Sequence, residues 1–405
     1  MTTIVQKFGG TSLATPQRIR SAAERVAGTR SDHDRVVVVV SAMGHTTDEL
    51  VALAAGVNPV PNSREMDMLL SAGETISAPL MAMALHRLGL EAISLTGFQA
   101  GIRTTGAHQK AHIVDVVPQR VVDELNRGRV VVVAGFQGAT EDLDITTLGR
   151  GGSDTSAVAL AVELGAEACE IFTDVPGVLT ADPRIVPAAT VLLTVDYAEM
   201  LELAALGARV LHSRAVEIGE AYSMPIRVRS TFDFGSGTLI CYHHAMEERP
   251  VVRGIAHDID VAKLTVVRVP DKPGAAAAIF GPLAGEHINV DIVVQNVSHE
   301  GTTDVSFTVA TADLARAIKV VEEAGRLIGA AGVQSADDIG KISVVGSGIM
   351  GTPGVFARVL ATLAENDINV QMISTGEIRM TCIIARDRVP DAAKALHSAF
   401  ELDQI

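Results

Sequence analysis

Short apolar runs alternate with longer amphipathic stretches over the first 240 residues of this 405-residue chain. The runs are rich in β-branched residues and nearly free of polar ones, which is typical of strands buried on both faces. We predict strands at Ile4–Phe8, Arg35–Val40, Ala92–Leu95, Arg129–Ala134 and Cys169–Thr173. We predict helices at Pro16–Ala27, Glu74–Leu88, Val116–Arg127 and Asp154–Leu164. This alternation indicates an α/β fold, with a mostly parallel sheet covered by helices on both faces.

The last third of the chain contains an internal repeat. The sequence DKPG at 271–274 recurs as GTPG at 351–354, and INV at 288–290 recurs as INV at 368–370, so each match lies 80 residues further on. Each copy predicts a strand, a Pro-Gly turn, a helix, an Ile-Asn-Val strand, a further strand and a helix. Gly235–Thr238 and the polar stretch 242–250 mark the boundary before it. Two copies of one unit favour side-by-side pairing with ligand sites at the seam, and a duplicated module without a ligand is the alternative.

Four polar or glycine-rich turns follow predicted strands in the first part of the chain. They are KFGGTS at 7–12, SAMGHTT at 41–47, GRGGSDT at 149–155, and TDVPG at 173–177 with TADPR at 180–184. Loops at the carboxyl ends of parallel strands share one edge of the sheet, where ligands bind. Glycine lets backbone N–H groups approach a phosphate, and the start of a helix favours an anion. A single such turn is usually structural, whereas four on one edge predict a nucleotide site held by distributed loops, since no P-loop sequence occurs.

Composition narrows the class of protein. The formal net charge is −15, aromatic residues make up 3% and tryptophan is absent, which argues against nucleic acid as a partner. The apolar runs are too short to span a bilayer, and we expect no membrane association. The three cysteines, Cys169, Cys241 and Cys382, form no CxxC pair and predict reduced thiols in a cytoplasmic protein.

One motif imitates a dinucleotide site. Gly346–Gly351 reads GxGxxG after a predicted strand at Ile342–Val345. A dinucleotide site requires an acidic residue about 20 residues further on, at the end of the next strand. That strand ends near Ser374 without such an acid, so we reject a dehydrogenase.

Taken together, the motifs resemble a known family. KFGGTS, SAM at 41–43, GRGGSDTSA at 149–157, TDVPG, TADPR and GARVLHSRA at 207–215 occur in the order found in aspartate kinases of the amino-acid kinase superfamily. The repeat, with DKPG, QNVS at 295–298 and ISTGEIR at 373–379, resembles their tandem ACT domains. The resemblance implies a three-layer αβα kinase domain at 1–245. It also implies two α+β, ferredoxin-like ACT domains at 262–338 and 339–405, the second completed by a strand from about 250–261.

The implied reaction transfers the γ-phosphoryl of MgATP to the side-chain carboxylate of L-aspartate, which starts lysine, threonine and methionine synthesis. A carboxylate acceptor is already ionised at neutral pH, so the reaction needs no general base. The enzyme must bring two anions together and neutralise charge on the transferring phosphoryl group. No tightly bound cofactor and no protein-held metal are expected, because Mg²⁺ arrives with ATP.

The resemblance assigns site residues by position. Lys7 would bind the phosphates, Asp154 would orient Lys7, and Arg150 would bind an aspartate carboxylate, which makes these three the expected catalytic residues. The matching substrate positions are Thr47, Glu74, Phe136, Arg150 and Ser153, with Glu74 on the substrate amino group. The matching ATP positions are Lys7, Gly9, Gly10, Ser41, Thr173, Asp174, Asp182, Arg184 and Arg209. Taken singly, Lys7, Glu74 and Arg209 also fit ordinary surface or helix-start residues.

The family's ACT domains bind lysine, threonine or both, often between subunits. The matching effector positions are Asp271, Gly274, Ala276, Asn289, Val290, Asp291, Gln295, Asn369 and Val370. A homodimer through these domains is therefore expected. A shorter subunit starting near Met246 would give an α2β2 assembly.

The chain departs from the family pattern at three positions. Leu179 replaces a frequent tyrosine, Arg209 a lysine and Ser213 a proline, and the planar guanidinium of Arg209 alters a nucleotide contact. The alternatives are a kinase for another amino-acid carboxylate and a non-catalytic amino-acid sensor.

Overall fold

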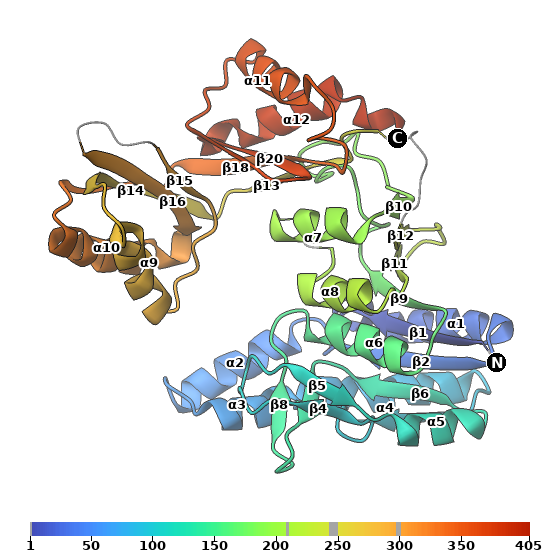
Figure 1. The fold of residues 1–405 in the computed structure, drawn as a ribbon. Coiled ribbons are helices and arrows are strands. Elements are labelled where there is room, and N and C mark those ends of the chain that lie inside the picture. The colour runs from blue at the N-terminus through green and yellow to red at the C-terminus, as the bar shows by residue number, and fades with distance from the viewer. Residues whose placement is uncertain (1, 208–209, 243–249, 297–300) are drawn as a thin grey trace. The chain divides into compact units, whose positions relative to one another are not determined.

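The computed structural model describes residues 2–207, 210–242, 250–296 and 301–405 (Figure 1). The chain divides into two units. The first unit comprises Met1–Val178 and Val191–Glu248, and the second comprises Leu179–Thr190 and Arg249–Ile405. A short segment, Leu179–Thr190, therefore belongs to the second unit although residues of the first unit flank it in sequence.

The first unit is built on an eight-stranded sheet with the order β10-β12-β11-β9-β1-β2-β6-β3. Its strands are β1 (Thr3–Phe8), β2 (Arg35–Val40), β3 (Ala92–Leu95), β6 (Val130–Ala134), β9 (Ala168–Thr173), β10 (Thr194–Val195), β11 (Ile226–Ser230) and β12 (Thr238–Ile240). All neighbours are parallel except β11 and β12. The carboxyl ends of β1, β2, β6 and β9 thus meet at one edge.

Helices cover both faces of this sheet (Figure 1). On one face, α1 (Pro16–Asp32) and α4 (Ala72–Arg87) pack on alternate residues of β1 and β2 such as Phe8 and Val38, in a fully buried cluster. On the other face lie α6 (Gly152–Glu163) and α8 (Ser213–Ala221). Because both faces are covered, these strands carry the uninterrupted apolar runs seen in the sequence.

The five predicted strands are present with bounds within one residue of those expected. The prediction of a helix from Val116 to Arg127 is wrong at its start. Val116 ends strand β5 (Ile113–Val116), and α5 (Gln119–Asn126) begins only after Pro118. Proline disfavours a helical conformation in the residue before it, which explains the late start. Gly235–Thr238 is also no boundary, because it links β11 to β12 within the same sheet.

The first unit also contains a second, small sheet and further helices. A second, small sheet pairs β5, β4 (Ile102–Thr104), β7 (Gln137–Ala139) and β8 (Ile145–Thr147). The helices not yet named are α2 (Thr46–Val57), α3 (Ser63–Leu70) and α7 (Tyr197–Ala205). Among the described residues one helical stretch, 63–87, has the length and hydropathy of a membrane span; half of its most apolar 18 residues are buried inside the protein.

The second unit contains two modules of similar build, each a four-stranded antiparallel sheet with two helices. The first module has the order β15-β16-β14-β17 and the helices α9 and α10. Its elements are β14 (Val261–Pro270), α9 (Ala275–Gly285), β15 (Val293–Gln295), β16 (Thr302–Ala310), α10 (Leu314–Ile328) and β17 (Gly332–Ala336). The second module has the order β13-β18-β20-β19. Its elements are β13 (Gly254–Asp258), β18 (Ile339–Val345), α11 (Val355–Glu365), β19 (Met372–Thr375), β20 (Arg379–Ala385) and α12 (Val389–Ala399).

The repeated sequence motifs occupy matching places in the two modules. Gly274 and Gly354 immediately precede α9 and α11 and have φ values of 90° and 94°, a conformation that glycine adopts without steric cost. The prediction that the Ile-Asn-Val triplets form strands is wrong. Ile288 and Ile368 instead close the turn after each helix, where their N–H groups donate to Leu283 and Leu363 and their side chains are buried.

The fourth strand of each module has a different origin. In the first module β17 follows the second helix and pairs with β14. In the second module the strand beside β18 is β13, which comes from the chain before the first module.

The segment Leu179–Thr190 is anchored in the second module. Ala181 and Val186 lie in that module's buried core. The Thr180 Oγ1 lies 2.9 Å from His397 Nε2, and the Thr190 hydroxyl donates to the Leu402 carbonyl at 3.0 Å. The N–H of Ile255 in β13 donates to the Thr180 carbonyl at 2.7 Å. No pattern in the sequence predicts this placement.

Candidate active site

An ion pair stands at the centre of the carboxyl edge. Lys7, near the end of β1, places its Nζ 2.6 Å from Asp154 Oδ1, and both side chains are 11% exposed. Asp154 lies in the first turn of α6, the helix packed on β1. The family resemblance implied this partnership, and the structure brings the two residues together.

The loop after β1 and the start of α4 pack too closely on Ala42, in the loop after β2, for side chains at two glycines. A Cβ on Gly10 would lie 2.9 Å from the Ala42 carbonyl oxygen, and one on Gly73 would lie 2.8 Å from Ala42 Cβ. Gly9 has space beside Lys7 Nζ, but its N–H already donates to the Phe172 carbonyl at 3.2 Å. The turn thus holds the lysine against the neighbouring strand.

Glu74 is the most perturbed acid of the site. It is 3% exposed and its Oε1 accepts the Ala42 N–H at 3.0 Å. Its Oε2 is buried and has no hydrogen-bond partner among the described residues. Burial raises the pKa of Glu74 to about 7, although the hydrogen bonds and Lys7 oppose the shift. A buried carboxylate oxygen without a donor is costly, and the amino group of a substrate would satisfy it.

Arg150 lies in a loop of glycines. Gly149 and Gly151 have φ values of 75° and 70°, and the Arg150 side chain is exposed between them. Together with Asp154 and His212, Arg150 lines a cavity of about 670 Å³. A Cβ on Gly151 would lie 2.2 Å from His212 Cβ, so the loop rests directly on the start of α8.

The other predicted substrate residues border the same edge. Phe136 follows β6 with a φ of 68°, and its N–H donates to Ser156 Oγ at 3.2 Å. Ser153 is buried at the start of α6, and Thr47 is in the first turn of α2. All five substrate positions therefore lie on loops or helix starts at the carboxyl edge.

The predicted nucleotide residues fall into three groups. Ser41 follows β2, Thr173 ends β9 and Asp174 follows it, all at the carboxyl edge. Asp182 and Arg184 belong to the second unit, where Arg184 Nη2 donates to Asp182 at 2.7 Å and lowers the pKa of that carboxyl. Arg209 lies outside the described residues.

Two residues that sequence reasoning missed support the Arg150 loop. Asp67, in α3, is fully buried and accepts hydrogen bonds from the Thr147 hydroxyl and the Gln109 N–H. Arg214, in α8, donates to the carbonyl oxygens of Leu148 and Ala111. An arginine in the motif GARVLHSRA was visible in the sequence, but a buried aspartate in an amphipathic helix gave no signal.

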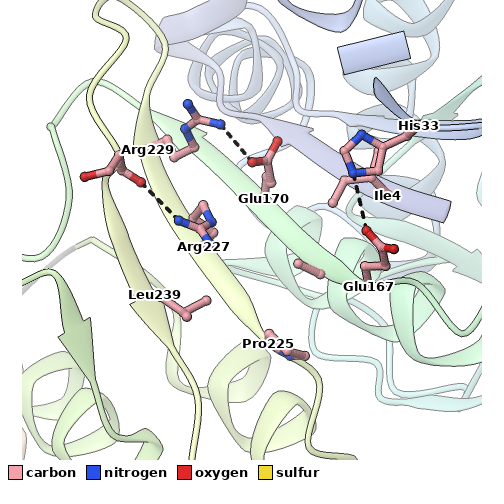
Figure 2. Close-up of a pocket in the computed structure, with 10 residues that line it drawn as sticks. Ile4, His33, Glu167, Glu170, Pro225, Arg227, Arg229 and Leu239 are labelled. Carbon is pink, nitrogen blue, oxygen red and sulfur yellow. Dashed lines mark hydrogen bonds and ion pairs between the residues drawn. The ribbon is translucent and has the colours of Figure 1, made fainter. Parts of the chain in front are cut away.

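A second cavity, of about 450 Å³, lies away from this edge, towards the amino ends of β1, β9 and β11 (Figure 2). We call it the charged hollow; Ile4, His33, Glu167, Ala168, Glu170, Pro225, Arg227, Arg229, Ser236 and Leu239 line it. Its acids face its bases: Arg229 Nη1 lies 2.9 Å from Glu170, and His33 lies 3.5 Å from Glu167. Gln6 also donates to Glu170 at 2.8 Å. Both carboxylate oxygens of Glu170 therefore have partners within the protein, whereas Arg229 Nε and Gln6 Oε1 are buried without one among the described residues.

No group of three or more His, Cys, Asp or Glu side chains in the described part of the chain is arranged to hold a metal. The three cysteines are free thiols.

The predicted effector residues separate into two sets within one chain. Asp271, Gly274 and Ala276 lie at the start of α9, whereas Asn289, Val290 and Asp291 follow its other end. An 11-residue helix is roughly 16 Å long, so the two sets are well apart. Gln295 ends β15, and Asn369 and Val370 follow α11 in the second module. Asp291 accepts a 2.6 Å hydrogen bond from the buried Lys341 of the second module.

The fold and site define an amino-acid kinase joined to paired regulatory modules. The model of the amino acid kinase family matches residues 2–230, and ACT domain models match 263–326 and 342–400. The chain is 51% identical to the aspartokinase of Corynebacterium efficiens, over 99% of this chain and 97% of that protein. E. coli aspartokinase III in complex with aspartate and ADP is 26% identical, with a TM-score of 0.82 over 98% of this chain and 99% of that one. The same enzyme in complex with lysine and aspartate is 25% identical, with a TM-score of 0.77 over the same shares.

The chain belongs to the aspartokinase family, whose members transfer phosphate from ATP to the carboxyl group of aspartate.

Proposed function

We propose that this chain phosphorylates the side-chain carboxylate of L-aspartate with MgATP at the Lys7–Asp154 pair. The observation that carries the proposal is the buried ion pair at the same edge as the unpartnered oxygen of Glu74. One group suits a phosphoryl group, and the other suits an ammonium group.

Lys7 stabilises the developing charge on the transferred phosphoryl group. Its side chain is nearly buried, so its interaction with an anion is less screened than in water. Asp154 holds the ammonium group in place at the start of α6, where the helix dipole also favours an anion. Gly9 and Gly10 keep the loop small enough for phosphates to approach.

Glu74 and Arg150 select the acceptor. Glu74 Oε2 pairs with the substrate ammonium, and Arg150 pairs with a carboxylate, a geometry that its planar guanidinium matches. Thr47, Phe136 and Ser153 complete the pocket. One carboxylate of the substrate is held by Arg150, and the other attacks the phosphoryl group. The reaction needs no general base, because both carboxylates are already ionised.

Lysine, threonine or both regulate the enzyme through the ACT domains. E. coli aspartokinase III adopts a T-state in complex with lysine and aspartate, and an R-state in complex with aspartate and ADP. The effector residues at the two ends of α9 are too far apart to meet within one module. We therefore place the effector between modules of two chains in a homodimer.

Two further features of the assembly belong to this proposal. A shorter subunit beginning near Met246, a residue outside the described ones, would form an α2β2 assembly. We place the enzyme in the cytoplasm, in keeping with its free thiols.

The test is acyl phosphate formation, trapped as the hydroxamate, with MgATP and a panel of acidic amino acids. We expect product with L-aspartate, at least a hundredfold less with L-glutamate and N-acetylglutamate, and a changed rate when lysine or threonine is added. Turnover with a different acidic amino acid, and none with L-aspartate, would show that aspartate is not the substrate. Effector binding without any turnover would support a sensor instead.

A further inference from the structure

The loop that carries Arg150 is intrinsically loose. Three of the four residues at 149–152 are glycine, and glycine samples more backbone conformations than any other residue. An arginine that must meet a carboxylate needs a fixed backbone, because a displacement of about 1 Å can cost about a hundredfold in rate. Something outside the loop must therefore hold it.

Arg214 holds the residue immediately before this loop. Its Nη1 donates to the Leu148 carbonyl at 2.6 Å, and its Nη2 donates to the Ala111 carbonyl at 3.0 Å. Leu148 is 1% exposed, so this peptide group lies inside the protein. Hydrogen bonds from a charged donor are shorter and stronger than neutral ones. One guanidinium thus joins α8 to two separate chain segments.

Asp67, in α3, holds the same two segments. Its Oδ1 accepts the Thr147 hydroxyl at 2.5 Å, and its two oxygens accept the Gln109 N–H at 3.0 and 3.1 Å. The His108 Nδ1 lies 2.7 Å from its Oδ2. Asp67 is fully buried, so removing an acceptor would leave buried donors unsatisfied.

The two clamps act on adjacent residues. Thr147 and Leu148 are neighbours, and the Ala111 N–H also donates to the Thr147 carbonyl at 3.0 Å. The backbone is therefore fixed from α3 and from α8 directly before Gly149 turns into its left-handed conformation. The hydrogen bonds of Arg214 and Asp67 described above all run to this backbone and its neighbours, and none of them runs to Lys7 or Asp154.

We propose that Arg214 and Asp67 are positioning residues that set the affinity for aspartate by fixing the backbone that carries Arg150. The inference rests on the proposed role of Arg150 as the carboxylate ligand. It predicts that both residues affect the binding of aspartate and that neither affects the binding of MgATP.

The test compares Arg214→Met and Arg214→Lys in the full-length protein, with KM measured separately for aspartate and for MgATP. Arg214→Met should raise KM for aspartate at least tenfold and leave KM for MgATP within twofold. Arg214→Lys keeps the charge but carries its donors on a single nitrogen, so its KM for aspartate should fall between those of Arg214→Met and the native enzyme. Asp67→Asn should shift the same constant in the same direction. Arg227→Met is the matched control, because Arg227 is also half-buried and also reaches a backbone carbonyl, that of Ser236.

A double variant separates this inference from the role of Arg150. If Arg214 acts through Arg150, Arg214→Lys should add less than twofold to KM for aspartate in an Arg150→Ala background. Equal rises in both KM values, or full additivity with Arg150→Ala, would overturn the positioning role. An unchanged KM for aspartate in Arg150→Ala alone would instead overturn the carboxylate role. If Arg214→Met does not fold, the test is whether Arg214→Lys raises KM for aspartate without raising KM for MgATP.

Discussion

The carboxyl edge and the charged hollow are two regions of one sheet with similar side chains and different electrostatics. In the hollow, Arg229 pairs with one carboxylate oxygen of Glu170 (Figure 2). Gln6 donates a hydrogen bond to the other oxygen. At the edge, Glu74 keeps a buried oxygen without a partner among the described residues, and Arg150 is exposed. A carboxylate whose two oxygens both have partners contributes to the fold, whereas a buried carboxylate oxygen left open costs stability and is retained where a ligand supplies the partner. The contrast predicts which of the two glutamates matters for catalysis.

The largest effect is expected at Lys7. Lys7→Ala should lower kcat by about 10³-fold, the loss typical of one removed charge-stabilising donor in a preorganised site. The measurement is hydroxamate formation at saturating MgATP and aspartate. Lys110→Ala removes an exposed lysine of the same unit and should be unaffected. A loss of less than tenfold in Lys7→Ala would remove this residue from the reaction centre.

Glu74 should come next, and its effect should depend on pH. Its carboxyl must be ionised to bind an ammonium group, and its pKa is about 7. In the native enzyme, kcat/KM for aspartate should therefore rise between pH 6 and pH 8. Glu74→Gln should lower kcat/KM by roughly a hundredfold at pH 8, as expected for loss of a buried charged partner, and abolish this rise. An unchanged pH profile in the variant would assign the ionisation to another group.

The same substitution should stabilise the protein without substrate. The pKa of Glu74 is raised from 4.5 in the unfolded chain to about 7 in the folded one. The unfolded state therefore loses its proton first, and stability falls as pH rises from 4.5 to 7. Above pH 7 the full penalty, about 3 kcal/mol at most, is present, and Glu74→Gln removes it. The urea midpoint of the variant should exceed that of the native protein at pH 8 and match it near pH 4.5.

The smallest effect on activity is expected in the charged hollow. Glu170→Gln should change kcat and both KM values less than twofold. It should lower the free energy of unfolding by about 2 kcal/mol, because Arg229 loses its partner in a largely buried pair. Adding Arg229→Met should recover part of that loss. A tenfold loss of activity would make the hollow functional and end the contrast between the two regions.

The sequence predicted the main sheet well because its strands are decided by burial. A run of valines such as Arg35–Val40 predicts a buried strand without any knowledge of its neighbours in the fold. The small sheet was missed because strands such as β8 have three residues and are partly polar, so tertiary pairing rather than local pattern makes them strands. The Ile-Asn-Val triplets were wrongly predicted as strands for a related reason. Their isoleucines are buried because they close the turn after a helix, and a local apolar pattern does not distinguish this from a strand.

Of the site, the resemblance to the family implied that Asp154 orients Lys7, and the structure places the two side chains in contact. The end of β1 and the start of α6 lie at one edge of the sheet, which makes this contact possible. The sequence did not identify Asp67 as a buried residue, because a single aspartate in a helix is normally exposed to solvent. It also did not show that Asp182 and Arg184 belong to the second unit, because that depends on partners such as His397, far along the chain.

The anchoring of Leu179–Thr190 has a consequence for synthesis on the ribosome. Thr190 hydrogen-bonds to Leu402, which is 212 residues further along the chain. At roughly 5–20 residues per second, the segment leaves the ribosome on the order of 10–40 s before its partner exists. During that interval Ala181 and Val186, which are buried in the finished protein, have no core to enter. Residues 179–190 therefore cannot reach their final packing while the first unit is being synthesised. They remain an undocked loop until the C-terminal end of the chain has been made.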